Sequence, residues 1–475
     1  MMKIMNENKS EKSIISNLIL PVILFATTGA FGFAIRGQAG FGAVPGCVFF
    51  GLLIAMVWFL LSHEETEKKQ RRYSLGWSVV ALIMGLGMAG SQGWMQWPAW
   101  VGGRFYTDYT TGAYINISPA VGLTWVFIAG VHWVGFGVIF LAWTGSKIPL
   151  KPVDWVIRIV FGVVGAGIAY GLYITFPQLF LPNYDVVNYT TCPQCVRIIG
   201  DIRLILVWTG MYLGFLAYEI VRKDWHNVKF ITVVSIITGI LWMIFMYTWQ
   251  VAVPNALPDV SFNWWRCWET SGGIGIGVAL GIGFYIYNKK LPDNHPMQRE
   301  MQHSKYRNGE RLIGVYFALA LALAYSVMNG IKGWLHIQFP NYPELNTTQL
   351  AWALPVSVLI FMIWFSIVYV TMKNPFQLND GKDNLSDFTK IFIPIYVIHR
   401  VIGLGVTWSI VPDISETAFF IYYLVLSGID FTILAILAKK RKPTFFKEFK
   451  SLFRFNFGRN TGEPKPQEEN SKEKR

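Results

Sequence analysis

Residues 29–46 read GAFGFAIRGQAGFGAVPG, a glycine-rich stretch that closes one apolar run and opens the next. Arg36 and Gln38 stand among the glycines, and Pro45 follows shortly after them. Glycine lets two backbones approach closely and leaves amide groups open to a ligand. The helix expected from about Phe41 also directs the positive end of its dipole at the same place. The stretch therefore predicts two membrane helices with one wall of a polar site between their ends.

The composition is that of a membrane protein. Of the 475 residues, 53% are hydrophobic and 15% are charged, whereas soluble domains carry roughly 25% charged residues. The chain also holds 20 Trp residues, which fits the aromatic belts at the two membrane surfaces. The lipid bilayer is thus the first partner that the sequence predicts.

Apolar runs long enough to cross a bilayer occur at about twelve places along the chain. They lie near residues 17–35, 41–62, 75–94, 118–144, 154–176, 202–221, 230–249, 268–288, 311–334, 350–372, 389–410 and 416–438. The fold class predicted is all-α, a polytopic membrane protein of about 12 transmembrane helices.

The basic residues predict the orientation. With the N-terminus placed in the cytoplasm, the exterior segments and the spans hold only a few of the 41 Lys and Arg residues: Arg36, Arg104, Arg158, Arg197, Arg203, Arg266, Lys332 and Arg400. All the others fall in cytoplasmic segments, which is the positive-inside pattern. We expect a multi-pass protein of the inner membrane with both termini cytoplasmic. The net charge of +13 then faces anionic lipid, so it does not indicate nucleic acid.

The chain divides into two six-helix halves on this interpretation, residues 17–221 and 230–438, joined by a short cytoplasmic connection at 222–229. A cytoplasmic N-terminus covers 1–16, and a basic tail at 439–475 holds an amphipathic segment and a disordered end. Gly-rich and Gly-Trp motifs recur at a similar offset, as in Ser91-Gln92-Gly93-Trp94 and Ile331-Lys332-Gly333-Trp334. The two halves could be parallel repeats or a chance similarity.

Charged and polar residues gather at the exterior ends of the glycine-rich spans. A charge in a membrane span is costly and calls for a functional or structural reason. Either these residues snorkel to the interface with local ion pairs, such as Arg266 with Glu269, or they share one site. The residues of the predicted solute site are Arg36, Gln38, Gln92, Arg266, Glu269, Asn329 and Lys332. Three cations against one carboxylate favour an anionic or polyhydroxylated solute.

A second group of polar residues lies inside spans. His399 and Arg400 fall near the middle of one span, and Asp430 lies in the next. A structural Arg–carbonyl or Arg–Asp clamp and a proton-linked or substrate role remain equally open for them. His132 is either a packed, hydrogen-bonded histidine or a proton-coupling group.

Cys192 and Cys195 form a C-x-x-C in an exterior loop. Zinc would need further ligands that do not stand nearby, so a local disulfide is the simpler prediction. No metal and no cofactor are predicted, because no phosphate-binding, dinucleotide, hydrolase or zinc-protease motif occurs.

Two functions compete. The favoured one is a transporter or permease, rather than an enzyme, whose site for a small polar solute is reached from outside. The alternative is a membrane-embedded enzyme that modifies a lipid-linked or exported glycan, with Glu269 or a histidine as the acid–base group. A non-catalytic membrane subunit is a third possibility. The solute, the coupling ion and the oligomeric state do not follow from the sequence.

Overall fold

The computed structural model describes residues 14–37, 44–62, 71–88, 90, 96–146, 151–292 and 414–441, with isolated positions at 322, 324–326, 328, 359, 362, 396, 397, 400, 401 and 404. The spans expected near 311–334 and 350–372, and most of 389–410, lie outside the described residues. The tail from 442 onward and residues 1–13 also lie outside them.

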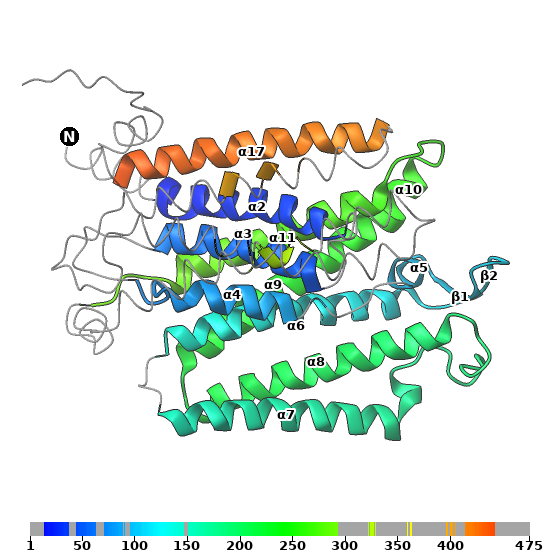
Figure 1. Cartoon of the computed structure of the whole chain (residues 1–475). Helices are drawn as coiled ribbons and strands as arrows, with labels where there is room; N and C mark the ends of the chain where they lie inside the picture. The colour runs from blue at the N-terminus through cyan, green and yellow to red at the C-terminus, as the bar shows by residue number, and fades with distance from the viewer. Residues whose placement is uncertain are drawn as a thin grey trace, which may run out of the picture.

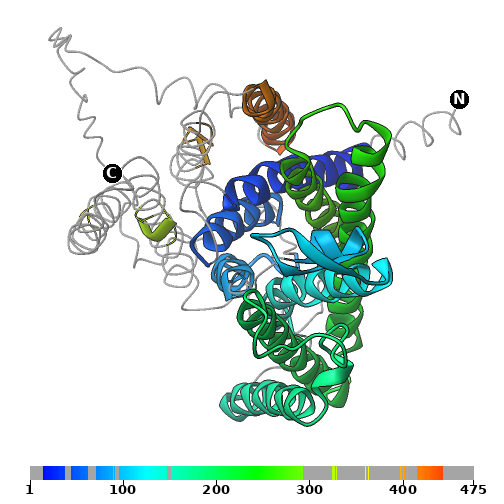
Figure 2. The ribbon, with the colours of Figure 1, turned by 90° about the vertical axis from the view of Figure 1, so that its right-hand side faces the viewer.

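The described elements follow one another along the chain as helices with one short hairpin. They are η1 (Ile15–Ile19), α2 (Leu20–Arg36), α3 (Val44–Ser62), α4 (Trp77–Met88), α5 (Trp97–Val101), β1 (Arg104–Asp108), β2 (Ala113–Asn116), α6 (Pro119–Thr144), α7 (Pro152–Thr175), η3 (Pro177–Leu179), α8 (Cys195–Val221), α9 (Trp225–Tyr247), η4 (Thr248–Ala252), α10 (Val253–Ala256), α11 (Trp264–Tyr287) and α17 (Ile414–Arg441). The long helices lie side by side, with α17 at one edge and α7 and α8 at the opposite edge (Figures 1 and 2).

Within the described ranges, eight helices are long and apolar enough to cross a membrane. Each overlaps one of the apolar runs that the sequence predicts, and α4 is a shorter apolar helix in the run near 75–94. The chain is therefore a mostly helical, polytopic membrane protein. The total of about twelve spans stays a prediction.

The outer helices present apolar side chains outward. On α7, Val156, Ile159 and Val163 are each more than half exposed. By contrast, α3 buries almost every side chain in the centre of the bundle. Exposed branched aliphatic residues along the whole of a helix are typical of a surface that contacts lipid.

Helices α2 and α11 pack closely because glycines face each other. A Cβ added at Gly29 would collide with the carbonyl of Gly273, and a Cβ added at Gly277 would collide with the backbone at Phe25. Small residues allow this backbone contact, which is the usual way that helices associate in a membrane. The contact brings α2, from the start of the chain, against α11, from its second half.

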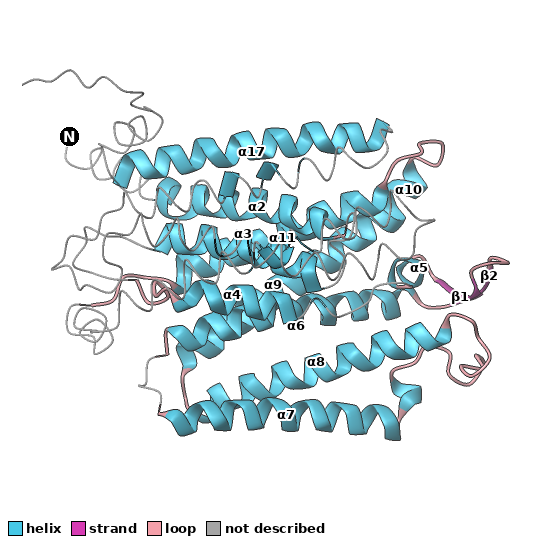
Figure 3. Cartoon of the chain, in the orientation of Figure 1, coloured by secondary structure: helices cyan, strands magenta, loops and turns pink. Residues whose placement is uncertain are grey.

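A β-hairpin covers one end of the bundle. Strands β1 and β2 pair antiparallel, with Arg104 opposite Asn116. The Gln96 side chain holds β1 by donating to the Tyr106 carbonyl at 3.0 Å and accepting from the Tyr106 amide at 3.1 Å. We call this end, formed by Gly37, α5, β1 and β2, the hairpin end; Figure 3 shows its strands and loops.

The opposite end, at the turns of residues 222–224 and 288–290, is closed by side-chain amides. Tyr73 donates its hydroxyl to Asn227 at 2.7 Å, and Asn227 donates to the Ala142 carbonyl at 3.0 Å. Asn288 donates to Ser62 at 2.7 Å and accepts from the Tyr73 amide at 2.9 Å. These bonds satisfy polar groups where α3, α6 and α11 end and α9 begins. We call this the turn end.

Candidate functional site

Arg36 and Glu269 approach each other at the hairpin end, where α2 ends and α11 begins. Gly37 follows Arg36 directly, and a Cβ added there would collide with the Glu269 carboxylate. Both charged residues are buried, with 5% of Arg36 and 4% of Glu269 exposed. The α2–α11 glycine contact thus places a cation and a carboxylate from distant parts of the sequence in one buried location, as a shared site requires.

Aromatic rings surround the Arg36 guanidinium. Its carbon lies 4.7 Å from the centre of the Phe33 ring and 5.5 Å from that of Trp133. The Phe33 ring also contacts Trp242 and Trp268, at centroid distances of 5.4 and 5.8 Å. Cation–π contacts of this kind hold an arginine in a dry place without removing its hydrogen-bond donors.

Arg266 pairs with a residue that the sequence did not single out. Its Nη2 lies 3.1 Å from the carboxylate of Glu416, which begins α17, and Asn263 also donates to Glu416 at 3.1 Å. The sequence suggested Glu269 as a local partner of Arg266. Among the described residues, the ion pair of Arg266 is with Glu416 instead. Glu416 could have been noticed, because it is an acidic residue just inside an apolar span.

The remaining predicted solute-site residues lie outside the described residues. These are Gln38, Gln92, Asn329 and Lys332. The structure thus brings Arg36, Arg266 and Glu269 to the same end of α2 and α11, and it adds Glu416. Two arginines and two glutamates give the described part of this cluster no net charge. We call these four residues the hairpin-end cluster.

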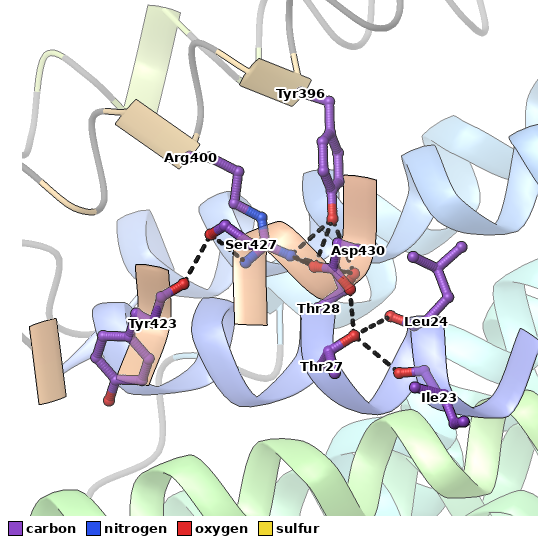
Figure 4. Close-up of polar contacts among 9 residues, drawn as sticks. All are labelled: Ile23, Leu24, Thr27, Thr28, Tyr396, Arg400, Tyr423, Ser427 and Asp430. Atoms are coloured by element: carbon purple, nitrogen blue, oxygen red, sulfur yellow. Dashed lines mark hydrogen bonds and ion pairs between the residues drawn. The ribbon is translucent and has the colours of Figure 1, made fainter. Parts of the chain in front are cut away.

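A second buried cluster lies between α2, α17 and the segment that holds Tyr396 and Arg400. Arg400 forms an ion pair with Asp430, and both side chains are almost completely buried. Figure 4 shows Tyr396 beside this pair: its hydroxyl donates to Asp430 at 2.9 Å and accepts from Arg400 at 2.6 Å. The sequence left open whether Arg400 and Asp430 meet, and the structure joins them.

Two threonines of α2 complete this cluster. Thr27 bonds to Asp430 Oδ1, and the Thr28 hydroxyl lies 3.0 Å from that of Tyr396 (Figure 4). The Arg400 guanidinium lies 4.2 Å above the Phe31 ring. The sequence missed both threonines, because a threonine in an apolar span usually bonds only to its own helix. His399 lies outside the described residues.

His132 packs within the bundle on α6. It is completely buried, and its Nδ1 lies 3.0 Å from the Ile128 carbonyl and 3.1 Å from the Thr209 hydroxyl. The histidine is therefore buried and hydrogen-bonded, and its proton-coupling role stays a prediction.

Cys192 and Cys195 are joined by a disulfide at the start of α8. Cys47 and Cys267 are both thiols, and Arg36 Nη1 lies 3.8 Å from the Cys47 sulfur. Among the described residues, no three His, Cys, Asp or Glu side chains gather closely enough to hold a metal ion.

Comparisons with known proteins do not extend this description. No protein-family model, no curated protein and no solved structure matches the chain. The function is therefore inferred from the chemistry of the residues themselves.

Proposed function

We propose that the protein is a transporter of the inner membrane that binds a small polar solute at the hairpin-end cluster. The observation that carries the proposal is the meeting of Arg36 and Glu269, from helices far apart in sequence, in one buried place. Residues that snorkel separately to an interface have no need of a shared location or of the glycine that makes room for it.

The proposed orientation places the hairpin end outside. Both termini are then cytoplasmic, as the distribution of basic residues predicts, and about twelve spans cross the membrane. The turn end, with Arg222, Lys223, Lys289 and Lys290, then lies at the inner surface. The division into halves at 17–221 and 230–438 belongs to the same proposal.

The solute is anionic or polyhydroxylated. The carboxylate of Glu416, which adds a second negative charge to the cluster, favours the polyhydroxylated class. Arginine supplies donors and glutamate supplies acceptors, so a ring of hydroxyl groups finds both partners in the hairpin-end cluster. Phe33, Trp133 and Trp268 offer flat apolar faces beside these charges. A cluster of no net charge in its described part gives a simple anion less reason to bind.

Uptake into proteoliposomes tests this function. The purified full chain is reconstituted and offered radiolabelled glucose, glucuronate and phosphate, which represent a neutral polyol, an anionic polyol and a simple anion. We expect uptake of at least one polyol by the wild type. Glu269→Gln and Arg36→Gln should each lower it about thirtyfold or more, because loss of a buried charged partner costs roughly 2–5 kcal/mol.

Arg197→Gln is the matched control, since Arg197 is an exposed arginine near the same end. It should leave uptake unchanged. Equal uptake by wild type and Glu269→Gln would show that the hairpin-end cluster is not the solute site.

The second candidate function is an enzyme that modifies a lipid-linked or exported glycan. Glu269 favours it, because a buried carboxyl group beside two arginines can act as an acid or base. The same protein is therefore also incubated with a lipid-linked oligosaccharide, and the products are separated by chromatography. Product formation without uptake, lost in Glu269→Gln, would replace transport by catalysis. A preparation that is folded and shows neither activity favours a non-catalytic subunit.

A further inference from the structure

Thr27 has more acceptors around its hydroxyl than it has hydrogens to donate. Its Oγ1 lies 2.8 Å from the Ile23 carbonyl and 3.2 Å from the Leu24 carbonyl, and it also bonds to Asp430 Oδ1. A threonine hydroxyl carries one hydrogen and two lone pairs. When Thr27 donates its hydroxyl hydrogen to the Ile23 carbonyl, as is usual in a helix, a lone pair of its oxygen faces Asp430.

The two oxygens of Asp430 have different surroundings. Oδ2 receives the Arg400 guanidinium and the Tyr396 hydroxyl, and Thr28 lies 3.4 Å from it. Oδ1 has Thr27 as its bonded partner among the described residues. Thus Oδ2 is supplied with donors, whereas Oδ1 faces a group that accepts a hydrogen as readily as it donates one (Figure 4).

The charged and titratable groups around Asp430 are few. From the segment at 396–404 they are Arg400 and Tyr396, whereas the Tyr423 hydroxyl on α17 bonds to Thr270 instead. The described face of α2 contributes Thr27, Thr28 and Phe31, none of which titrates. Among the described residues, one cation therefore opposes the charge of Asp430.

We propose that Asp430 is a proton-binding site inside the membrane. A proton from water adds to Oδ1, so that one O–H bond forms and the carboxylate becomes a neutral acid. That hydrogen is donated to Thr27 Oγ1, which donates its own hydrogen to the Ile23 carbonyl, so both hydroxyl hydrogens have an acceptor. On release, the proton returns to water and Thr27 turns its hydrogen to Oδ1.

Protonation changes how α17 is held against the segment that holds Tyr396 and Arg400. The neutral acid no longer attracts the Arg400 guanidinium as an ion, although Tyr396 and the Phe31 ring still contact it. Within the described residues, Arg400 Nε has no hydrogen-bond partner, so the arginine keeps donor capacity for a new acceptor. Proton binding thus lowers the cost of separating α17 from the segment that holds Tyr396 and Arg400.

This site stands apart from the proposed solute site. It does not depend on what the hairpin-end cluster binds, and in a transporter it would supply the coupling ion. α17 carries both Asp430 and Glu416. A movement of this helix on protonation of Asp430 would therefore also shift Glu416 and its ion pair with Arg266.

Infrared difference spectroscopy tests the proposal without any solute. The full chain in lipid is measured at about pH 8 and about pH 5, where ordinary carboxyl groups remain mostly ionised. We expect carboxylic-acid C=O absorption in the acidic spectrum of the wild type, with one band that is absent from Asp430→Asn and present in Glu269→Gln. Asp201→Asn, the same change at a partly exposed carboxylate paired with Arg197, should retain the band.

Two further variants sharpen the result. Arg400→Gln removes the cation, so the band should be present at both pH values and its pH difference should vanish. Thr27→Val removes the acceptor of the new hydrogen but keeps the shape, so the band should move to higher frequency. Thr27→Val leaves Asp430 in place, so it tests the proposal even if the Asp430→Asn protein does not fold into a monodisperse preparation.

Identical wild-type and Asp430→Asn difference spectra would overturn the proposal and leave Arg400–Asp430 as a permanently ionised clamp. A band whose frequency does not change in Thr27→Val would also contradict it. Neither result bears on uptake at the hairpin-end cluster, so the two proposals fail separately.

Discussion

Gly37 shows how one residue adapts a helix end to its neighbour. Its dihedral angles, φ −84° and ψ −4°, are ones that any residue adopts. Its backbone therefore does not require glycine. The Glu269 carboxylate lies where a Cβ at this position would stand. Glycine at position 37 thus leaves room for Glu269 beside Arg36.

We expect Gly37→Ala to lower the free energy of unfolding and to reduce solute uptake. The added methyl forces the Glu269 carboxylate away, and overpacking of this kind costs about 1–3 kcal/mol. Thermal unfolding of the purified protein measures the loss. Gly171→Ala is the control, since a Cβ there meets nothing within 4 Å. Its stability should be unchanged or slightly higher; equal behaviour of the two variants would mean that Glu269 moves aside freely.

At the scale of elements, α7 and α8 form a hairpin with its own buried ion pair. Arg158 Nε donates to Glu219 at 2.7 Å, and neither side chain is exposed. The Arg158 guanidinium lies 4.9 Å from the Trp143 ring centre and 5.1 Å from that of Trp155. This pair links the outer hairpin to α6, because Trp143 belongs to α6.

We expect Arg158→Gln to destabilise the α7–α8 hairpin by about 3–5 kcal/mol, because it leaves Glu219 buried without its cation. The double variant Arg158→Met with Glu219→Leu removes both charges and should recover most of that loss. Limited proteolysis in detergent and thermal unfolding report the difference. If the double variant were as unstable as the single one, the pair would stabilise the hairpin by more than charge compensation.

At the scale of the whole molecule, the proposed topology predicts which loops are reached from outside. Thr110 lies exposed in the turn between β1 and β2, and Lys223 lies exposed in the turn between α8 and α9. On a Cys267→Ser background, a membrane-impermeant maleimide should label Thr110→Cys in intact cells. Lys223→Cys should be labelled only after lysis.

The opposite labelling pattern would place the hairpin end in the cytoplasm. It would also remove the reason to expect an oxidising compartment around Cys192 and Cys195, whose oxidation in the mature protein stays a prediction. The two cysteine variants are each other's control, because both lie in short turns of the same bundle.

The sequence by itself determined the helices. An apolar run of bilayer length can satisfy its backbone in a membrane only as a helix, so local composition is sufficient. It also identified Arg36, Glu269 and Arg400, because a charge in such a run is conspicuous wherever the helix packs. It did not indicate the β1–β2 hairpin, whose strands are short and lack a continuous alternation of apolar and polar residues.

Only the tertiary structure decided which charges meet. Arg266 and Glu269 are neighbours along one helix, yet the ion pair of Arg266 is with Glu416 of α17. Thr27 and Asp430 are separated by almost the whole chain and bond across α2 and α17. Helical periodicity fixes a residue's face on its own helix, whereas its partner depends on how two helices are rotated and how closely they approach. Here the glycines between α2 and α11 set that approach, and their effect is visible only in three dimensions.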